Sequence, residues 1–485
     1  MLFHTIEYAI FFPIVVFLYF LIPHKFRWAL MLAASYYFYA CWKLEYLSLI
    51  VISTIIDYFA ARQIAASDNK GSKKAFLLLS LASNLGILFF FKYFNFFSTS
   101  AQAAFDQFNI FVDVPTFDYL LPVGISFYTF QTLSYTIDVY KGNQQPEKHF
   151  GIFALFVSFF PQLVAGPIER STHLLPQFHQ RQAFDFGRLT NGLKLILWGL
   201  FKKVIIGDSL SIFVDSVYST PASHDSLSLL LASICFAFQI YADFSGYTDI
   251  ARGSAQVIGF DLMENFKQPY TAKSISEFWR RWHISLSTWF RDYVYIPLGG
   301  NRTVKWRWYY NLFVTFTVSG LWHGANWTFV LWGALHGFYL IFAIITEDSR
   351  NRLKKSLGIS RNETVHKLVQ VLSVFVLVLI GWVFFRAENI SDAFYILGQI
   401  FDPRTYTWTF SLVSNVQANS PFSFALGMGC LILFLILDTM SKDKQFPDFL
   451  NGHKLAYRWT IVYILLFCLV FFTPKGSGQF IYFQF

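Results

Sequence analysis

Two histidines lie in a long stretch of the sequence that carries no other ionisable side chain. Between Trp308 and Thr346 there is no Asp, Glu, Lys or Arg, but His323 and His336 are present. A neutral imidazole in such surroundings can take a proton from an attacking hydroxyl group as a general base. Glycines flank His323 in the sequence SGLWHGANW (319–327), and small residues let a ligand or another chain approach the backbone. The alternative is a structural histidine that is hydrogen-bonded between helices.

A second group of candidates lies in EFWRRWHISLSTWFRDY, residues 277–293. As one helix, this segment would place Phe278, Trp282, Ser285 and Trp289 on one face. The arginines on the other faces are Arg280, Arg281 and Arg291. The pattern predicts a basic, aromatic helix at the cytoplasmic interface, and by itself it favours membrane anchoring. The functional alternative is a site for a phosphate-bearing donor such as a coenzyme A thioester, because Arg binds phosphate through paired hydrogen bonds.

The composition indicates the scaffold that holds these residues. Of 485 residues, 55% are hydrophobic, 21% are aromatic and 14% are charged, whereas about 25% are charged in soluble domains. Such a chain could not cover a water-exposed surface with polar groups, which excludes a soluble enzyme, a disordered protein and a disulfide scaffold. The net charge of +9 does not indicate nucleic acid as a partner, because Lys and Arg lie in short loops between apolar runs. We therefore expect an all-α polytopic membrane protein.

Metal and redox chemistry find no support in the sequence. The cysteines lie within or beside apolar segments and lack metal-binding spacing, so they are expected to be small buried hydrophobes. They are Cys41, Cys235, Cys430 and Cys468. No phosphate-binding loop, dinucleotide fingerprint or zinc motif occurs, and we predict no metal site.

About 11–12 membrane-spanning helices are predicted, because about 20 apolar residues are needed to cross about 30 Å of hydrocarbon. The candidate segments are Ile6–Ile22, Trp28–Trp42, Tyr46–Ala61, Ala75–Phe97, Tyr119–Tyr140, Leu189–Ile206, Leu227–Tyr241, Trp308–Trp322, Trp327–Thr346, Leu368–Phe385, Phe422–Leu437 and Trp459–Thr473. The first segment lacks a basic flank and a small-residue cleavage site, so we expect a retained span and not a removed signal.

Loop charge predicts the orientation of these spans, because basic loops stay on the cytoplasmic side. The basic loops are His24–Arg27, Arg62–Lys74, Arg302–Arg307, Arg350–Lys367 and Lys442–Arg458, whereas Ser98–Asp118 and Gly207–Asp225 contain no Lys or Arg. The alternation places both ends of the chain outside, provided that residues 150–168 do not cross. Pro161, Gly166 and Pro167 break a helix there, so we expect a re-entrant hairpin shielded by protein.

Long motifs in the chain resemble the membrane-bound O-acyltransferase (MBOAT) superfamily, specifically its bacterial alginate O-acetylase-like branch. The motifs are EFWRRWHISLSTWFRDYVYIPLGGN (277–301) and LWHGANWTFVLWGALHG (321–337), supported by segments 121–140, 159–170 and 239–249. The resemblance implies one domain over residues 1–479 in the bacterial inner membrane. It also implies re-entrant and interfacial helices and a ring of tilted helices around a central funnel, with catalysis at the funnel's narrow floor.

The same resemblance assigns roles to individual residues. It implies that His323 is catalytic, and that His283 positions the substrate or hydrogen-bonds at the same site. The donor it implies is an acetyl-CoA-like thioester, which is a substrate, so no permanently bound cofactor is expected. The basic and aromatic residues expected to guide this donor are Arg280, Arg281, Trp282, Lys305 and Arg307.

The last six residues, FIYFQF (480–485), form a separate tail. They are similar to the FxYFxF ending of a small partner peptide in teichoic-acid D-alanylation systems, whose tyrosine is a proposed acyl relay. That similarity predicts Tyr482 as a relay that passes acetyl to an extracytoplasmic esterase-like acetyltransferase partner. An aromatic anchor at the membrane interface is the alternative.

The function expected from all these features is O-acetylation of an extracytoplasmic, alginate-like polysaccharide, with membrane lipid around the protein. Peptidoglycan O-acetylation and teichoic-acid D-alanylation are alternatives within the same chemistry. A transporter that makes no bonds is the alternative from another class. Transporters commonly carry inverted repeats with paired broken helices, and the sequence displays no such pairing.

Overall fold

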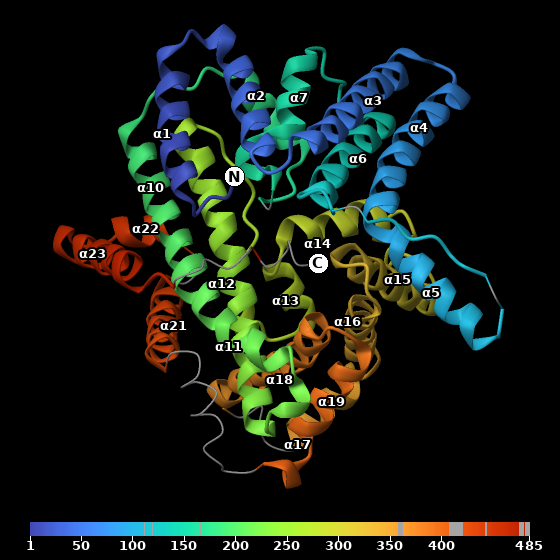
Figure 1. Cartoon of the computed structure of the whole chain (residues 1–485), viewed down its shortest axis with the longest axis vertical. Coiled ribbons are helices and arrows are strands. Elements are labelled where there is room, and N and C mark those ends of the chain that lie inside the picture. Colours follow the sequence, from blue (N-terminus) through green and yellow to red (C-terminus); the bar gives the residue numbers. More distant parts are fainter. Residues whose placement is uncertain are drawn as a thin grey trace. The chain divides into compact units, whose positions relative to one another are not determined.

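The structure is a computed structural model, and it describes residues 1–110, 112–118, 120–164, 166–356, 362–406, 421–441, 444–474 and 480. All regular elements of these residues are helices (Figure 1). The chain divides into two compact units. The first comprises 1–196 and 247–263, and the second comprises 197–246 and 264–485. This division follows backbone contacts, and one membrane domain over residues 1–479 stays a prediction.

The helices up to residue 258 are α1 (Ile6–Leu21), α2 (His24–Ala40), η1 (Leu44–Tyr46), α3 (Leu47–Ala66), α4 (Lys70–Leu88), η2 (Phe89–Tyr93), α5 (Phe94–Gln107), α6 (Ile125–Lys141), α7 (Phe150–Ser158), α8 (Phe160–Leu163), α9 (Ser171–His179), α10 (Phe186–Leu200), η3 (Phe201–Gly207), α11 (Asp208–Tyr218), η4 (Pro221–Ser223) and α12 (Ser226–Ile258). The later helices are η5 (Pro269–Thr271), α13 (Ile275–Arg281), α14 (Ile284–Phe290), η6 (Arg291–Tyr295), α15 (Lys305–His323), α16 (Trp327–Ile345), α17 (Glu347–Ser356), α18 (Glu363–Arg386), α19 (Ile390–Phe401), η8 (Pro403–Thr405), α21 (Pro421–Ser441), α22 (Phe446–Asn451) and α23 (Leu455–Phe472).

Six helical stretches in the described residues are long and apolar enough to cross a membrane, and each overlaps a predicted span. They are Leu44–Ala66, Lys70–Gln107, Ser226–Ile258, Trp327–Ile345, Glu363–Arg386 and Leu455–Phe472. The other predicted spans also coincide with helices, but these helices are shorter or more polar than the six above. The protein is therefore an all-α, multi-pass membrane protein, as its composition predicts.

In the first unit, a polar cluster joins α3, α4 and α6, which lie side by side (Figure 1). The Asp57 carboxylate of α3 is fully buried and accepts hydrogen bonds from Ser80 Oγ (2.5 Å) and Asn84 Nδ2 (2.9 and 3.0 Å) of α4. Thr132 Oγ1 of α6 donates to Asn84 Oδ1 at 3.2 Å. Because a buried polar group is costly unless it is hydrogen-bonded, this network ties three helices in one arrangement.

The segment predicted as a re-entrant hairpin is broken into short helices. Helix α7 has nine residues and α8 has four. At 1.5 Å per residue, α7 is about 14 Å long, so it is too short to cross a bilayer by itself. From Gly151 to Leu163 the chain is buried. The structure thus agrees with a segment that is shielded by protein.

In the second unit, the wide helical turn η3 places Lys203 against two carboxylates. Lys203 Nζ lies 2.7 Å from Asp208 Oδ1 and 2.7 Å from Asp243 Oδ1 of α12, and all three side chains are buried. Partnered charges of this kind are tolerated inside a membrane protein, whereas a single charge is not. The cluster fixes η3 against α12 next to Phe244, a residue of the candidate site.

Helices α15 and α16 form a tight hairpin, also in the second unit. A Cβ atom added to Gly320 would lie 2.2 Å from the carbonyl oxygen of Phe329 and 3.0 Å from the Cα atom of Gly333. The two backbones can approach this closely because neither glycine has a side chain. The crossing point lies less than one turn before His323, so it fixes the position of that histidine.

Candidate active site

His323 is the last residue of α15 and lies at the turn into α16. Gly324 follows in an extended conformation, and a Cβ atom there would lie 2.2 Å from the Phe329 ring. Asn326 caps α16 by accepting a hydrogen bond from the backbone N–H of Thr328 at 3.0 Å. This glycine-containing turn presents the imidazole to the interior, where 4% of its surface is exposed.

Aromatic rings enclose His323 on several sides. The ring centroids of Trp322 and Trp332 lie 5.0 Å from that of His323, and the centroid of Phe385 lies 5.4 Å away. Trp332 and Phe385 are buried, and they come from α16 and α18. Such a shell excludes water, which strengthens every polar interaction made inside it and protects a reactive ester or thioester from hydrolysis.

His283 links two short helices in a left-handed backbone conformation, with φ 43° and ψ 55°. Asn265 holds this turn, because its carbonyl oxygen accepts from Ile284 N at 3.0 Å and its Oδ1 accepts from Ser285 N at 3.2 Å. The prediction of one continuous helix over 277–293 is therefore wrong: α13 ends at Arg281 and α14 begins at Ile284. Non-glycine residues in this conformation are uncommon and cluster at functional sites.

The aromatic face of this segment also differs from a membrane anchor. Phe278 and Trp282 are each 1% exposed, and the Trp282 ring lies 4.9 Å from that of Trp382 and 5.0 Å from that of Phe266. These side chains pack inside the second unit. These aromatic side chains therefore form part of the core and do not anchor the protein in the membrane, as the pattern alone would favour.

The structure brings the two predicted histidines together. The ring centroids of His283 and His323 lie 6.3 Å apart with the planes inclined by 58°, and His283 has no exposed surface. At this separation both rings can contact one small group, such as a hydroxyl or a thioester carbonyl. The arrangement supports proton transfer by one imidazole while the other holds the reacting group.

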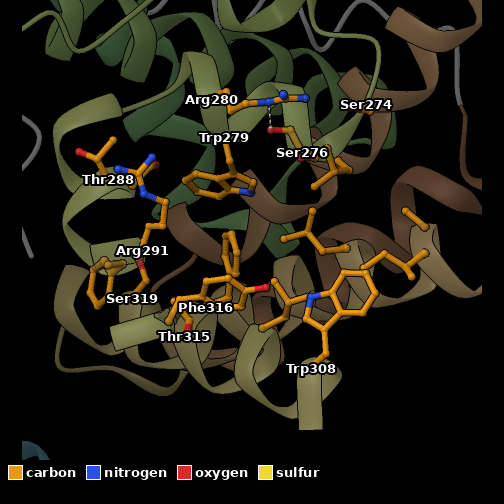
Figure 2. Close-up of a pocket in the computed structure, with 18 of the residues that line it drawn as sticks. Ser274, Ser276, Trp279, Arg280, Thr288, Arg291, Trp308, Thr315, Phe316 and Ser319 are labelled. Carbon is orange, nitrogen blue, oxygen red and sulfur yellow. Dashed lines mark hydrogen bonds between the residues drawn. The ribbon is translucent and has the colours of Figure 1, made fainter. Parts of the chain in front are cut away.

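A pocket of about 590 Å³ is lined by residues of α13 to α17, which include Ile284, directly after His283, and Ser319, four residues before His323 (Figure 2). Its wall is mainly apolar and aromatic, including Trp279, Trp308 and Phe316. Arg280, Arg291 and Arg350 also line it, and Arg291 Nε lies 2.7 Å from Asp292 Oδ1. In Figure 2 the Arg280 side chain lies above the Trp279 ring, and its Nε donates to the carbonyl oxygen of Ser276 at 3.4 Å.

Helix α15 leads from the pocket to His323. Thr315 and Ser319 line the pocket and are labelled in Figure 2. Thr315, Ser319 and His323 follow one another at intervals of four residues, so they share one face of the helix. Two hydroxyl side chains of the pocket wall therefore lie on the same face of α15 as the buried histidine.

The predicted donor residues are placed differently from one another. Arg280 lines the pocket, whereas Arg281 pairs with Glu277, with Nη2 at 2.7 Å from Oε1. Trp282 belongs to the core, and Lys305 and Arg307 at the start of α15 do not line the pocket. The sequence indicates Arg291 as one of the arginines of this motif but not as one of the donor residues. It does not indicate Arg350, which lies in a basic loop far along the chain.

The C-terminal tail approaches the histidine site at one described residue. Phe480 is fully buried, its ring centroid lies 5.9 Å from that of Phe244, and Phe244 lies 4.7 Å from His283. Tyr482 lies outside the described residues. Within the part of the chain that the structure describes, no group of three His, Cys, Asp or Glu side chains is placed to hold a metal ion.

Comparisons with known proteins find a matching family model and several similar proteins. The model of the MBOAT, membrane-bound O-acyltransferase family, matches residues 58–385. The chain is 39% identical over 440 residues to the probable alginate O-acetylase AlgI of Azotobacter vinelandii, covering 90% of this chain and 84% of the relative. It is 38% identical to the protein of the same description from Pseudomonas putida, covering 98% of both chains. The peptidoglycan O-acetyltransferase of Helicobacter pylori is 37% identical, over 76% of this chain and 72% of the relative.

Proposed function

Because this chain belongs to the membrane-bound O-acyltransferase family, we propose that this acyltransferase moves an acetyl group from a cytoplasmic thioester to an extracytoplasmic, alginate-like polysaccharide. The observation that carries the proposal is the enclosed pair of His283 and His323, 6.3 Å apart at the end of the Thr315–Ser319 row. Identity of 38–39% to two probable alginate O-acetylases, over 90% and 98% of this chain, supports the acceptor class.

His323 acts as the general base in this proposal. Its imidazole takes the proton of an attacking hydroxyl group, the hydroxyl oxygen forms a bond to the thioester carbonyl carbon, and the carbon–sulfur bond breaks. The proton then passes to the leaving thiolate, so the products are an ester and a free thiol. His283 holds the carbonyl or hydroxyl group in position, and the aromatic shell keeps water from hydrolysing the thioester.

The pocket at α13 to α17 holds the donor. Arg280, Arg291 and Arg350 are suited to the phosphates of coenzyme A, because guanidinium groups bind phosphate through paired hydrogen bonds. The hydroxyls of Thr315 and Ser319 match the amide groups of the pantetheine arm, which carries the thioester toward His323. The thioester is a substrate, and no permanently bound cofactor takes part.

Tyr482 receives the acetyl group before the polymer does. Tyr482 follows Phe480 by two residues, a length of chain that spans at most about 7 Å, and Phe480 packs against Phe244, which contacts His283. The phenolic ester that forms is more activated than a sugar ester, which makes onward transfer favourable. An esterase-like acetyltransferase partner outside the bacterial inner membrane then passes the acetyl group to the polysaccharide.

Peptidoglycan is the second candidate acceptor, because the Helicobacter relative at 37% identity is a peptidoglycan O-acetyltransferase. The two candidates share the donor pocket and the histidines and differ only in the partner and the polymer. Acetyl content of isolated alginate and of muropeptides, measured in the same cells, separates them.

The test uses acetyl-labelled acetyl-CoA with the enzyme in membranes, and follows label on the protein and on the polymer. His323→Ala should lower transfer by about 10²–10⁴-fold, the usual contribution of a general base. His366→Ala is the matched control, since His366 lies near the start of α18, about 28 Å along that helix from the Phe385 contact of His323.

Two outcomes would overturn parts of the proposal. Acetylation at the wild-type level by His323→Ala protein of normal membrane abundance would exclude the general base. Undiminished polymer acetylation by Tyr482→Phe, which keeps the ring and removes the hydroxyl group, would reduce the tail to an anchor. Peptide mapping for an acetyl adduct on Tyr482 tests the relay directly.

A further inference from the structure

An apolar groove in the first unit runs beside helix α1. It has a volume of about 560 Å³, and its lining is formed by apolar side chains of α1, α10, α12 and the segment before α10. Representative lining residues are Val16, Phe20, Phe184, Leu189, Leu193 and Val257. Leu193 and Phe184 keep 48% and 58% of their surfaces exposed, so the groove opens outward. A surface of this composition is suited to hydrocarbon chains.

Two arginines lie at one end of the groove. Arg27 is 8% exposed, its guanidinium lies 5.6 Å from the centroid of the Phe20 ring, and its Nη1 donates to the carbonyl oxygen of Gln182 at 2.6 Å. Arg188 precedes the lining residue Leu189, and its Nη2 donates to the carbonyl oxygen of Ala183 at 2.5 Å.

Few acidic residues lie near these basic residues in the sequence. Arg188 Nε is buried and has no hydrogen-bond partner in the described part of the chain. Lys25 and Arg181 add exposed positive charge on the two flanking segments. Asp185 is the single acidic residue between Gln180 and Leu189, and its Oδ1 accepts from the backbone N–H of Arg188 at the start of α10. Positive charge therefore predominates at this end.

We propose that this groove is a binding site for an anionic glycerophospholipid, with the acyl chains along α1 and the phosphate at Arg188, Lys25 and Arg181. Arg27 holds the end of the groove together through its bonds to Gln182 and its contact with Phe20. The predicted orientation places His24–Arg27 and residues 181–188 on the cytoplasmic side. Anionic lipids are concentrated in that leaflet, and basic pockets between membrane helices bind their head groups.

The site stands apart from acyl transfer, because all its residues belong to the first unit and none belongs to the histidine site or the donor pocket. A lipid held between α1, α10 and α12 would stabilise the packing of these three helices. A ligand that binds only the folded state stabilises that state, by a free energy that grows with the logarithm of the ligand concentration divided by its dissociation constant.

The experiment is native mass spectrometry of the full-length protein with phosphatidylglycerol or phosphatidylcholine of identical acyl chains. We expect tighter retention of phosphatidylglycerol by the wild-type protein. Arg188→Gln and Lys25→Gln should each weaken that preference about fivefold, which is the usual effect of one basic residue near an anionic head group. Leu193→Trp fills the groove and should reduce retention of both lipids.

Lys74→Gln is the matched control, because Lys74 is an exposed basic residue at the start of α4 in the same unit. Equal retention of the two lipids by the wild-type protein would overturn the proposal. So would a loss in Lys74→Gln as large as the loss in Arg188→Gln, because it would mean that charge alone attracts the lipid. Lys25 is exposed, so its variant keeps the test valid if Arg188→Gln fails to fold.

Discussion

At the residue scale, the site depends on two histidines that reach the same place by different means. His323 is delivered by a helix end and a glycine turn, whereas His283 is delivered by a left-handed backbone turn that Asn265 holds. For a residue other than glycine, this backbone conformation costs roughly 1–2 kcal/mol. The left-handed conformation is kept despite this cost, because helices α13 and α14 must diverge at His283 to place its ring beside that of His323.

This strain predicts an unusual order of stability at position 283. His283→Gly should unfold at a higher temperature than His283→Ala, with a difference in unfolding free energy of about 1 kcal/mol, because glycine adopts φ 43° without strain. Both variants should lose acetyl transfer. Thermal unfolding of the detergent-solubilised variants measures the difference, and an Ala variant as stable as the Gly variant would contradict the strain.

His173, which lies outside the membrane-spanning helices, predicts how the stability of the protein depends on pH. His173 Nδ1 lies 2.9 Å from Glu169 Oε2, and its Nε2 lies 3.4 Å from Asp261 Oδ2. These carboxylates, Asp261 first and Glu169 second, raise the pKa of His173 from 6.5 to about 10. A raised pKa contributes stability that is complete below pH 6.5 and is lost as the pH rises toward 10.

The comparison of wild type with His173→Gln isolates this contribution from other titrating groups. The wild-type protein should melt at a higher temperature than the variant near pH 6.5, and the gap should narrow steadily toward pH 10. A gap that stays constant across this range would mean that the imidazole is not held as a cation. The histidine is partly exposed, so salt should also narrow the gap.

At the element scale, the hairpin of α15 and α16 sets the geometry of His323. Gly320→Ala places a methyl group 2.2 Å from the carbonyl oxygen of Phe329, which is backbone and cannot turn aside. We expect this substitution to separate the helices, to cost about 1–3 kcal/mol of stability and to lower acetyl transfer. Gly86→Ala in α4 is the control, because a Cβ atom there has no neighbour within 4 Å.

The outcome is measured by unfolding of the purified variants and by acetyl transfer in membranes. Gly86→Ala should be neutral or slightly stabilising, since alanine favours a helix more than glycine does. A Gly320→Ala enzyme with full activity would indicate that the position of His323 does not depend on this crossing.

Some elements could be predicted from the sequence and others could not. Length and hydropathy located the spanning helices, because an apolar run of sufficient length has few alternatives in a membrane. The break at His283 was missed, because Asn265, which lies 18 residues earlier, supplies the hydrogen bonds that hold the turn. Local periodicity contains no information on such a contact.

The same distinction applies to the donor pocket. Charge counting selected Lys305 and Arg307, which are near the motif in sequence, whereas the pocket takes Arg350 from the start of α17. Arg350 lies 59 positions after Arg291 in the sequence. Both arginines line one pocket because helices α15 and α16, which lie between them in the chain, pack against each other. A lining set that spans six helices, η6 included, follows from tertiary packing, which no spacing rule describes.

At the scale of the whole molecule, the orientation in the membrane decides which side supplies the thioester and which side receives the acetyl group. The basic loops predict that Asp68 is cytoplasmic and that Asp113 is outside. Gln180 is cytoplasmic only if residues 150–168 do not cross, as the nine-residue length of α7 supports. Single cysteines at these three positions test the scheme up to residue 180.

The cysteines are introduced as Asp68→Cys, Asp113→Cys and Gln180→Cys in a Cys41→Ser background, since Cys41 is the exposed native cysteine and the other three are buried. A membrane-impermeant maleimide should label position 113 in intact cells, and positions 68 and 180 only after permeabilisation. Labelling of position 180 from outside would mean that residues 150–168 cross the bilayer. That result would reverse the orientation of the first five predicted spans relative to the later ones, and with it the side from which the donor pocket is filled.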